Sequence, residues 1–489
     1  MAHIVRVEPG GLCLTAESGT TLFALLRTHG LAPEAPCGGH GACGKCGVLV
    51  DGKKKLACRT MIDRDLTVTL PERFRARILT VIAAPAESPV SAGSGPAAAF
   101  DIGTTTVVCS LMTGETGRKP VTVGALNPQQ PWGADVVSRI RAALDGQQAA
   151  QTEVIRACMR DLIREACALA GISPASVRVI SVVGNPCMQQ LFLGMSVENL
   201  AAIPFSPKIT RPDHSLENPF PDLCPEAVLL TVPDISGYVG ADTVACIAAT
   251  EMLQSESNIL MVDIGTNGEI VLKANGRIAS CSTAAGPALE GAKIRCGMRA
   301  SDGAIDRVSV ENGKLRCHVI GDSEPKGICG SGTVDAAAAV LSLGMINRRG
   351  RILSGPEPDG ERRIPLAGDC FLTQDDIREI QLAKGAIAAG ILVLCEHIGI
   401  RLEEIDEVLL AGAFGSFIDP ENACRIGLLP SAMREKIRAV GNAAGAGAVL
   451  FALRPEAFEE TASIVQAVEP VELASEESFR KRFAECMYF

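Results

Sequence analysis

Four cysteines gathered in one glycine-rich stretch constrain this chain more than any other feature of its sequence. The stretch reads Cys37-GGHGA-Cys43-GK-Cys46-GVLVDGKKKLA-Cys58, so three thiols share one loop and the fourth follows after 11 residues. The glycines between them allow the backbone to wrap closely and to direct N–H groups at sulfur. Four thiolates at this spacing predict a metal centre.

The spacing also separates one kind of centre from another. Three crowded cysteines with one distant partner resemble the ligand pattern of plant-type [2Fe–2S] ferredoxins. A structural zinc site more often has two separated Cys-x2-Cys pairs, and only one such pair occurs here. The pattern therefore favours a [2Fe–2S] cluster held by Cys37, Cys43, Cys46 and Cys58, with zinc or no metal as the alternatives. Because four cysteines complete a ligand set, we interpret His40 as a loop residue.

Composition excludes several classes of function. The chain has 489 residues, 47% of them hydrophobic, and a net charge of −10, which argues against nucleic acid as a partner. Its first residues show no apolar run behind basic residues, and apolar stretches such as 386–395 are too short to cross a membrane. The other cysteines are scattered singly, as expected of small buried residues in a reducing compartment. We expect a cytoplasmic protein with no membrane partner.

Residues 1–80 predict a small α+β domain of the β-grasp class used by ferredoxins. HIVRVEP and LCLTAES form a hairpin that turns at Gly10-Gly11, and Thr20 caps a short helix that ends at Gly30. DLTVTLP supplies a closing strand after the cysteines. Residues 81–97, rich in Ala, Pro, Ser and Gly, predict a flexible linker.

From residue 98 the chain is α/β, and it repeats itself. AAAFDIGTTTVVCSL (97–111) matches ILMVDIGTNGEIVLK (259–273), and residues 177–191 match 406–419 as buried strands that enter small-residue loops. Two copies of one unit predict two similar lobes, 98–255 and 256–489, that face each other. The second carries extra material, including a long helix over about 374–398 opened by a capping box of Thr373 and Asp376.

The two Asp-Ile-Gly-Thr segments together predict strand–turn–strand units that bind phosphate, with structural hairpins as the alternative. They are not a P-loop, whose Gly-x4-Gly-Lys motif is absent. Glycine closes the turn so that N–H groups point into one space, and hydroxyls add donors. Asp101 and Asp263 are candidates to hold Mg²⁺, and Glu269 is a candidate to orient the attacking water. The predicted phosphate ligands are Gly103, Thr104, Thr105, Thr106, Gly265, Thr266 and Asn267.

Three further glycine-rich segments are candidates for the same nucleotide site, with structural turns as the alternative. The loop after strand EVLL permits close approach to a base or ribose. Gly330-Ser331-Gly332, before the predicted helix TVDAAAAVL, can place a helix N-terminus against the nucleotide. We interpret Cys296 and Cys329 as buried residues and Lys53, Lys54 and Lys55 as a solvated turn. The candidate residues are Gly286, Gly330, Ser331, Gly332, Gly412, Ala413, Phe414 and Gly415.

These motifs resemble a known family. The two turns and GAFGS are similar to the motifs of the actin-like (ASKHA, RNase H-like) ATPases, which include acetate and sugar kinases. The combination with an N-terminal [2Fe–2S] domain resembles the reductive activators of corrinoid enzymes, as do GNPCMQQLFLG, PDISGYVGADTVACI, AAGPALEGAKIRCGM, GICGSGTVDA and LAGAFGSFIDPENACRIGLLP. The fold implied is a β-grasp ferredoxin domain followed by a two-lobed actin-like ATPase.

The resemblance implies that the chain uses ATP and Mg²⁺ to transfer one electron from the [2Fe–2S] cluster to a Co(II) corrinoid protein of a methyltransferase system. The Co(I) product accepts a methyl group. An external donor of the ferredoxin or flavodoxin type would reduce the cluster, and the family implies a homodimer. The alternatives are an activator of another enzyme, such as a 2-hydroxyacyl-CoA dehydratase, or a small-molecule kinase with an attached redox domain.

Overall fold

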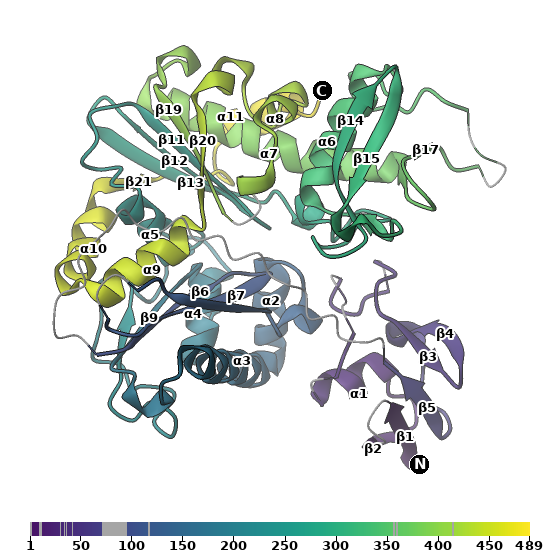
Figure 1. The fold of residues 1–489 in the computed structure, drawn as a ribbon, viewed down its shortest axis with the longest axis horizontal. Helices are drawn as coiled ribbons and strands as arrows, with labels where there is room; N and C mark the ends of the chain where they lie inside the picture. The colour runs from purple at the N-terminus through teal and green to yellow at the C-terminus, as the bar shows by residue number, and fades with distance from the viewer. Residues whose placement is uncertain are drawn as a thin grey trace.

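Three main sheets organise the chain in a computed structural model that describes residues 2–8, 12–29, 31–33, 35, 37–41, 43–70, 95–115, 118–355, 357, 360–412 and 415–489. A small N-terminal sheet lies to one side, and two larger sheets are separated by helices (Figure 1). The N-terminal region, purple in Figure 1, lies in the corner between the two larger parts. Its position determines which segments of the two larger parts can contact the cysteine loop.

The N-terminal sheet is mixed and packs against one helix, as the predicted β-grasp class requires. Its order is β2-β1-β5-β3-β4, with β1 antiparallel to β2 and parallel to β5. Helix α1 (Leu22–Thr28) buries Leu22, Phe23, Leu25 and Leu26 in its core. The strands are β1 (Ala2–Glu8), β2 (Leu12–Glu17), β3 (Gly47–Val50), β4 (Lys53–Leu56) and β5 (Leu66–Thr69).

The predicted cap of α1 is wrong by one residue. Thr21, not Thr20, caps the helix, because its hydroxyl accepts from the Ala24 N–H at 3.2 Å. The carbonyl of Thr20 instead accepts from the Ile62 N–H at 2.9 Å. This pairing holds Thr20 in extended structure, so the helix begins after it. The predicted turn at Gly10-Gly11 and the predicted helix end at Gly30 lie outside the described residues.

The two larger sheets share one strand order, which confirms the internal repeat. The first is β10-β9-β6-β7-β8, and the second contains β20-β19-β11-β12-β13 in the same order. In both, the strand before the Asp-Ile-Gly-Thr turn pairs antiparallel with the strand after it and parallel with the strand of the second matched segment. The first-sheet strands are β6 (Ala97–Ile102), β7 (Thr106–Met112), β8 (Val121–Leu126), β9 (Val179–Gly184) and β10 (Val228–Thr231).

The second sheet has the same five strands and one more at its edge. They are β11 (Ile259–Ile264), β12 (Gly268–Ala274), β13 (Arg277–Thr283), β19 (Glu407–Ala411), β20 (Ile437–Gly441) and β21 (Val468–Pro470). Helices α5 (Ala241–Ala249) and α9 (Ala443–Leu453) lie between the two sheets (Figure 1). A shared core that includes Val183, Val244, Met261 and Val449 joins the lobes there. The lobes are therefore packed together at one end and separated by a cleft at the other.

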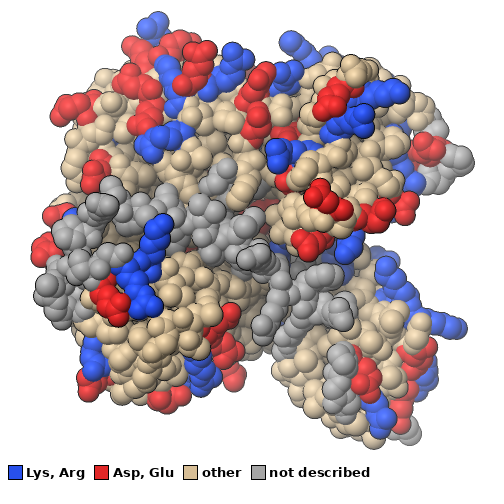
Figure 2. Space-filling model, in the orientation of Figure 1, with Lys and Arg blue, Asp and Glu red and all other residues tan. Residues whose placement is uncertain are grey.

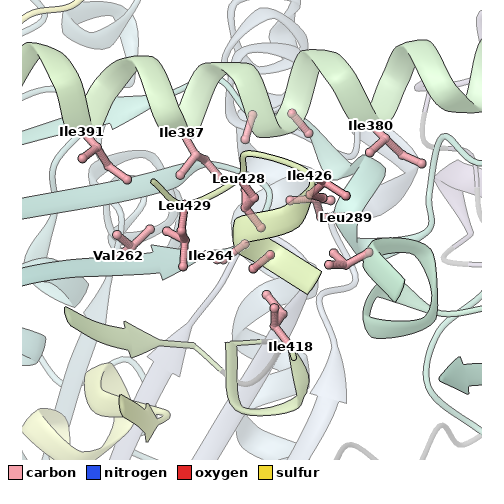
Figure 3. Packing of buried hydrophobic residues seen from close by; sticks show 14 of the residues in the cluster. Val262, Ile264, Leu289, Ile380, Ile387, Ile391, Ile418, Ile426, Leu428 and Leu429 are labelled. Atoms are coloured by element: carbon pink, nitrogen blue, oxygen red, sulfur yellow. The ribbon is translucent and has the colours of Figure 1, made fainter. Parts of the chain in front are cut away.

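The long helix α7 (Gln374–Ile398) forms over the predicted range, and its capping box is present. The Thr373 hydroxyl accepts from the Asp376 N–H at 3.1 Å, and the Asp376 carboxylate accepts from the Thr373 N–H at 2.8 Å. Its buried face, with Ile380, Ile387 and Ile391, packs over the second sheet and the segment after α8 (Pro420–Arg425) (Figure 3). These apolar residues at helical spacing thus belong to the main hydrophobic core of the second lobe.

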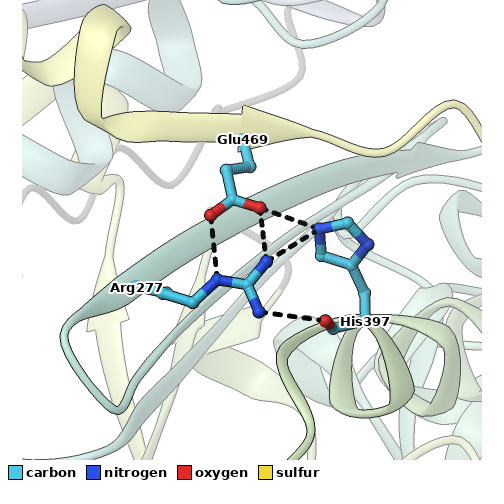
Figure 4. A network of polar contacts seen from close by, with 3 residues as sticks. All are labelled: Arg277, His397 and Glu469. Atoms are coloured by element: carbon cyan, nitrogen blue, oxygen red, sulfur yellow. Dashed lines mark hydrogen bonds and ion pairs between the residues drawn. The ribbon is translucent and has the colours of Figure 1, made fainter.

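An exposed polar network joins the extra strand β21 to the second lobe (Figure 4). The guanidinium of Arg277 on β13 makes two hydrogen bonds to the Glu469 carboxylate, Nε–Oε1 at 3.0 Å and Nη2–Oε2 at 2.6 Å. The ring of His397, in the last turn of α7, lies 2.9 Å from Glu469 Oε2. The arginine and the histidine lower the pKa of Glu469 to about 2.

The remaining helices and strands cover the two sheets or extend the second lobe. In the first lobe they are α2 (Val136–Ala142), α3 (Gln148–Ala170) and α4 (Pro186–Leu193). In the second they are β14 (Ala304–Glu311), β15 (Lys314–Val319), β16 (Gly327–Ile328), α6 (Gly330–Ser342), β17 (Arg363–Pro365), β18 (Phe371–Thr373), α10 (Pro455–Ala467) and α11 (Glu477–Cys486). Gly330, Ser331 and Gly332 form the first turn of α6, not a loop before it.

Two properties bear on partners. None of the helices among the described residues has the length and apolar character needed to cross a membrane. Acidic and basic side chains are interspersed over the face drawn in Figure 2.

Residues 71–94, and with them most of the predicted linker 81–97, lie outside the described residues.

Candidate functional site

The cysteine loop leads from the α1 region to β3 and β4 and brings the predicted ligands close together. Cys46 Sγ lies 3.2 Å from Cys58 Sγ, and Cys43 is hydrogen-bonded to Cys37. Gly38, Gly39, Gly41 and Gly44 all have positive φ, the backbone region that glycine adopts without strain. Burial, followed by the neighbouring Cys46 thiol, raises the pKa of Cys58 to about 11.

The four thiols form two pairs. Among the described residues, no three cysteine, histidine or carboxylate side chains converge closely enough to enclose one metal ion. A mononuclear zinc site needs four ligands around one point. In a [2Fe–2S] cluster each iron takes two protein ligands, so Cys37 with Cys43 and Cys46 with Cys58 match its two ends. The pairing of Cys37 with Cys43 and of Cys46 with Cys58 is thus compatible with the two ends of such a cluster.

A second candidate site is the cleft between the two lobes. Its volume is about 670 Å³, and both Asp-Ile-Gly-Thr turns face into it. The hydroxyls of Thr105 and Thr266, one from each turn, lie 3.1 Å apart. The predicted residues that line the cleft are Asp101, Gly103, Thr104, Thr105, Thr106, Asp263, Gly265, Thr266, Asn267, Glu269, Gly330, Ser331 and Gly412.

Other predicted residues do not line this cleft. Gly286 precedes the turn Pro287–Glu290, and Gly415 packs on the backbone of Leu410. Gly332 has a packing role, since a Cβ there would lie 2.2 Å from the Ile305 carbonyl oxygen. Ala413 and Phe414 lie outside the described residues. The loop after β19 therefore contributes Gly412, where a Cβ would lie 2.4 Å from the Asp263 carboxylate.

Acidic side chains crowd the floor of the cleft. Burial raises the pKa of Asp101 to about 6, an effect that the Asn442 amide, 2.9 Å away, partly offsets. Burial, then the charges of Asp242 and Asp101, raise the pKa of Asp263 to about 7. Glu269 lies opposite Asp263 on the neighbouring strand, and its pKa is also raised by burial. Buried carboxylates that repel one another are the donor set that a hard cation such as Mg²⁺ neutralises.

Sequence reasoning missed the glutamate that bridges the two turns. The carboxylate of Glu290 accepts hydrogen bonds from Thr105, on the first lobe, and from Thr266, at 3.0 Å, on the second. Its only sequence signal is an acidic residue within the segment AAGPALEGAKIRCGM. It therefore reaches the hydroxyls that were predicted to bind phosphate.

Two asparagines that support the first turn were also missed. Asn185 caps α4 through Oδ1, and its Nδ2 donates to the Thr104 hydroxyl at 3.1 Å. Asn442 caps α9 in the same way, and its Nδ2 donates to Asp101. Both share the same signal, a Gly-Asn pair whose glycine ends a strand and whose asparagine precedes a helix, which predicts a helix cap.

A two-lobed α/β fold of repeated topology with an acidic cleft between paired turns defines an actin-like ATPase. The family models described as the RACo middle region and as the C-terminal, ASKHA, domain of RACo match residues 97–255 and 257–489. The chain is 36% identical over 406 residues to the corrinoid activation enzyme RamQ of Eubacterium limosum, covering 78% of this chain and 68% of that protein. This chain belongs to the RACo family of reductive activators of corrinoid enzymes.

Two further relatives agree with this placement. The [Co(II) methylated amine-specific corrinoid protein] reductase of Methanosarcina barkeri is 28% identical over 418 residues, which cover 78% of this chain and 74% of that protein. A solved structure described as a reductive activator for a corrinoid, iron–sulfur protein superposes with a TM-score of 0.73 at 26% identity. That match covers all of this chain and 98% of the other.

Proposed function

We propose that this chain is an ATP-driven reductive activator that returns the cobalt of a corrinoid protein from Co(II) to Co(I). One electron leaves the reduced, cysteine-held centre and one Co(II) gains it, while ATP and water become ADP and phosphate in the cleft. The observation that carries the proposal is the presence, in one chain of the RACo family, of a four-cysteine loop and a two-sided acidic cleft.

The four cysteines are proposed to hold a [2Fe–2S] cluster, which would supply a one-electron carrier. The two-pair arrangement of Cys37 with Cys43 and Cys46 with Cys58 supports this choice over zinc. Iron and sulfide analysis of anaerobically isolated protein, with EPR of the reduced form, tests it. Two irons per chain are expected, and zinc or four irons shared by two chains would contradict it.

The cleft is proposed to bind Mg²⁺ and ATP. Asp101 and Asp263 would hold the ion from the two lobes, and the hydroxyls of Thr104, Thr105, Thr106 and Thr266 would bind phosphate oxygens. The main-chain N–H groups of Gly103 and Asn267, together with the first turn of α6, would add donors, and Gly412 would allow the ribose or base to approach. The Gly265 N–H bonds to the Asn267 carbonyl at 2.9 Å, so Gly265 would close the turn that lines the phosphates. The other nucleotide-site residues of the sequence prediction, Gly286, Ala413, Phe414 and Gly415, stay predictions.

Two glutamates are candidates to orient the attacking water. Glu269 is buried beside Asp263 and bonded to the Ser282 hydroxyl at 3.3 Å. Glu290 is placed between the two turns. Glu269→Gln and Glu290→Gln compared in single-turnover hydrolysis separate them, because the one that orients water loses the chemical step while ATP still binds.

The proposed organisation comprises the cluster domain 1–80, the linker 81–97 and the lobes 98–255 and 256–489. The protein would work in the cytoplasm as a homodimer and accept electrons from a low-potential donor of the ferredoxin or flavodoxin type. Light scattering of the purified protein tests the dimer. Anaerobic reduction of the protein by candidate donors, followed by its visible spectrum, tests the donor.

The decisive test of the proposed function is an anaerobic reconstitution. Chemically reduced protein, Mg²⁺ and ATP are added to candidate corrinoid proteins, and the conversion of Co(II) to Co(I) is followed by its absorption. Spectral conversion that needs ATP is the expected result. ATP hydrolysis stimulated by a sugar but not by any corrinoid protein would favour the kinase alternative instead.

A further inference from the structure

The cysteine loop contacts the second lobe through Lys45, which lies between Cys43 and Cys46. Its ammonium group donates to the carbonyl oxygens of Gly297, at 3.0 Å, and Ile294, at 3.3 Å. Charge-assisted bonds to two carbonyls fix a position more firmly than apolar contact does. The acceptors are 249 and 252 residues away in sequence, so these bonds fasten one domain to another.

The same domain also contacts the first lobe. The Arg27 guanidinium lies 5.9 Å from the centre of the Trp132 ring, and a Cβ on Gly38 would lie in ordinary contact, 3.6 Å, with the Trp132 carbonyl oxygen. Trp132 is 5% exposed. The N-terminal region therefore touches both lobes, in the corner where Figure 1 places it. A movement of one lobe relative to the other would disturb at least one of these contacts.

The second-lobe contact continues into the cleft. Residues 290–297 form a tight unit, because a Cβ on Gly297 would lie 1.9 Å from the Gly291 carbonyl oxygen and the Gly297 N–H bonds to Ile294. At one end of this unit Glu290 bonds to Thr105 and Thr266. At the other, the carbonyls of Ile294 and Gly297 accept from Lys45. A displacement of Glu290 therefore reaches the acceptors of Lys45 within eight residues.

The contact with the first lobe is linked to the first Asp-Ile-Gly-Thr turn. Arg139 is fully buried, and its guanidinium donates to the carbonyl oxygens of Thr104, at 2.5 Å, and Gly133, at 3.1 Å. Gly133 directly follows Trp132. Each contact of the cysteine-loop domain is thus linked to the cleft through one side chain, Glu290 to both turns and Arg139 to the first.

We propose that residues 290–298, together with Trp132, form a nucleotide-gated docking site for the cysteine-loop domain. Without nucleotide the site holds the domain through Lys45. A bound triphosphate competes with the Glu290 carboxylate for the hydroxyls of Thr105 and Thr266 and repels it, because both are anionic. Glu290 then withdraws, the carbonyls of Ile294 and Gly297 shift, and the domain is released toward an external acceptor. This inference rests on the proposed binding of ATP in the cleft.

Hydrogen–deuterium exchange of the full-length protein, with and without a non-hydrolysable ATP analogue and Mg²⁺, tests the docking site. Peptides covering 37–46 and 290–298 should exchange about tenfold faster with the analogue, because undocking removes the mutual shielding of the two segments and lets their backbones open locally. Calorimetry on the same samples measures whether the analogue binds. If the analogue binds and neither peptide changes its exchange rate, the docking site is overturned and the proposed function stays intact. If the analogue does not bind, the docking site and the proposed function are both overturned.

Lys45→Ala gives an independent test, with Lys54→Ala as its control. Lys54 is an exposed lysine on β4 of the same domain, so the control removes an equal charge. Lys45→Ala should show the fast exchange without the analogue and no further change with it, at unchanged iron content. The analogue should bind Lys45→Ala at least as tightly as the original protein, because docking and nucleotide binding oppose each other. Lys54→Ala should behave like the original protein. Slow exchange in Lys45→Ala that still responds to the analogue would contradict the role of Lys45.

Discussion

The two Asp-Ile-Gly-Thr turns have the same strand order around them but different supports. The first is held within its own lobe, where Arg139 binds the Thr104 carbonyl, Asn185 binds the Thr104 hydroxyl and Asn127 binds the Gly103 carbonyl at 2.8 Å. The second is joined through Thr266 to Glu290, which also reaches across the cleft. Repetition of the chain thus gives two similar backbones, one fixed and one connected to the segment that contacts the cysteine loop.

This difference suggests a division of labour between the lobes. A turn supported by buried groups of its own lobe keeps its geometry when ligands bind, because each displaced group would leave a buried polar atom unsatisfied. Glu290 binds a hydroxyl of each turn, so phosphate can compete with it at both, but Glu290 itself belongs to the second lobe and moves with it. The first lobe then serves as a fixed support and the second as the sensor.

The largest effect is expected where the turns are alike. Asp101→Asn and Asp263→Asn should each lower the rate of ATP hydrolysis by about 10²–10³, since each removes a charge proposed to hold Mg²⁺. Asp161→Asn, at an exposed position on α3, is the control. A near-normal rate in either cleft variant would show that the ion is held by one lobe alone.

The support of the first turn should appear in stability. Arg139→Met leaves three buried acceptors, the carbonyls of Thr104 and Gly133 and the amide oxygen of Gln129, without their donor. The free energy of unfolding should fall by about 3 kcal/mol. Arg141→Met, on the exposed side of the same helix, should change it by less than about 0.5 kcal/mol. Equal urea midpoints for the two variants would argue against a fixed first turn.

The response of the second turn should appear in affinity. Glu290→Gln removes the charge that competes with phosphate, so ATP should bind about fivefold more tightly, as measured by calorimetry. Glu311→Gln, at an exposed position on β14, should leave the affinity unchanged. Weaker binding in Glu290→Gln would instead mean that this carboxylate helps to hold the metal ion.

The smallest effect is expected at β21, which only the second lobe has. Because Arg277 and His397 lower the pKa of Glu469, the network stabilises the fold at pH values above the ordinary glutamate pKa and loses its effect as the pH falls toward about 2. Arg277→Ala should lower Tm slightly at pH 7, and the difference should shrink as the pH falls below about 4. A difference that grows in acid would contradict this sign.

The sequence predicted what depends on local pattern. The repeat around Asp101 and Asp263 located both turns, because the same apolar strand followed by Asp-Ile-Gly-Thr occurs twice in matched contexts. The apolar period and capping box located α7. The four cysteines were found by spacing alone.

What the sequence missed depends on contacts between distant segments. The position of Glu290 depends on hydrogen bonds from two threonines that lie 185 and 24 residues away in sequence. Lys45 looks like an ordinary loop lysine until the second lobe supplies two carbonyls. Gly332 shows why a glycine is hard to interpret from sequence, because glycine serves close packing and close ligand approach equally. Its contact with the Ile305 carbonyl gives it a packing role, and its role toward a ligand stays a prediction.

The most direct test of the whole mechanism is a single-turnover measurement of Co(I) formation under anaerobic conditions. Chemically reduced protein is mixed with a Co(II) corrinoid protein that it activates, with and without Mg²⁺ and ATP, and compared with reduced Asp263→Asn. Co(I) should form only with ATP and the unchanged cleft, although both proteins carry an equally reduced centre. Equal rates of Co(I) formation with and without ATP would contradict the claim that the cleft controls electron delivery from the cysteine loop.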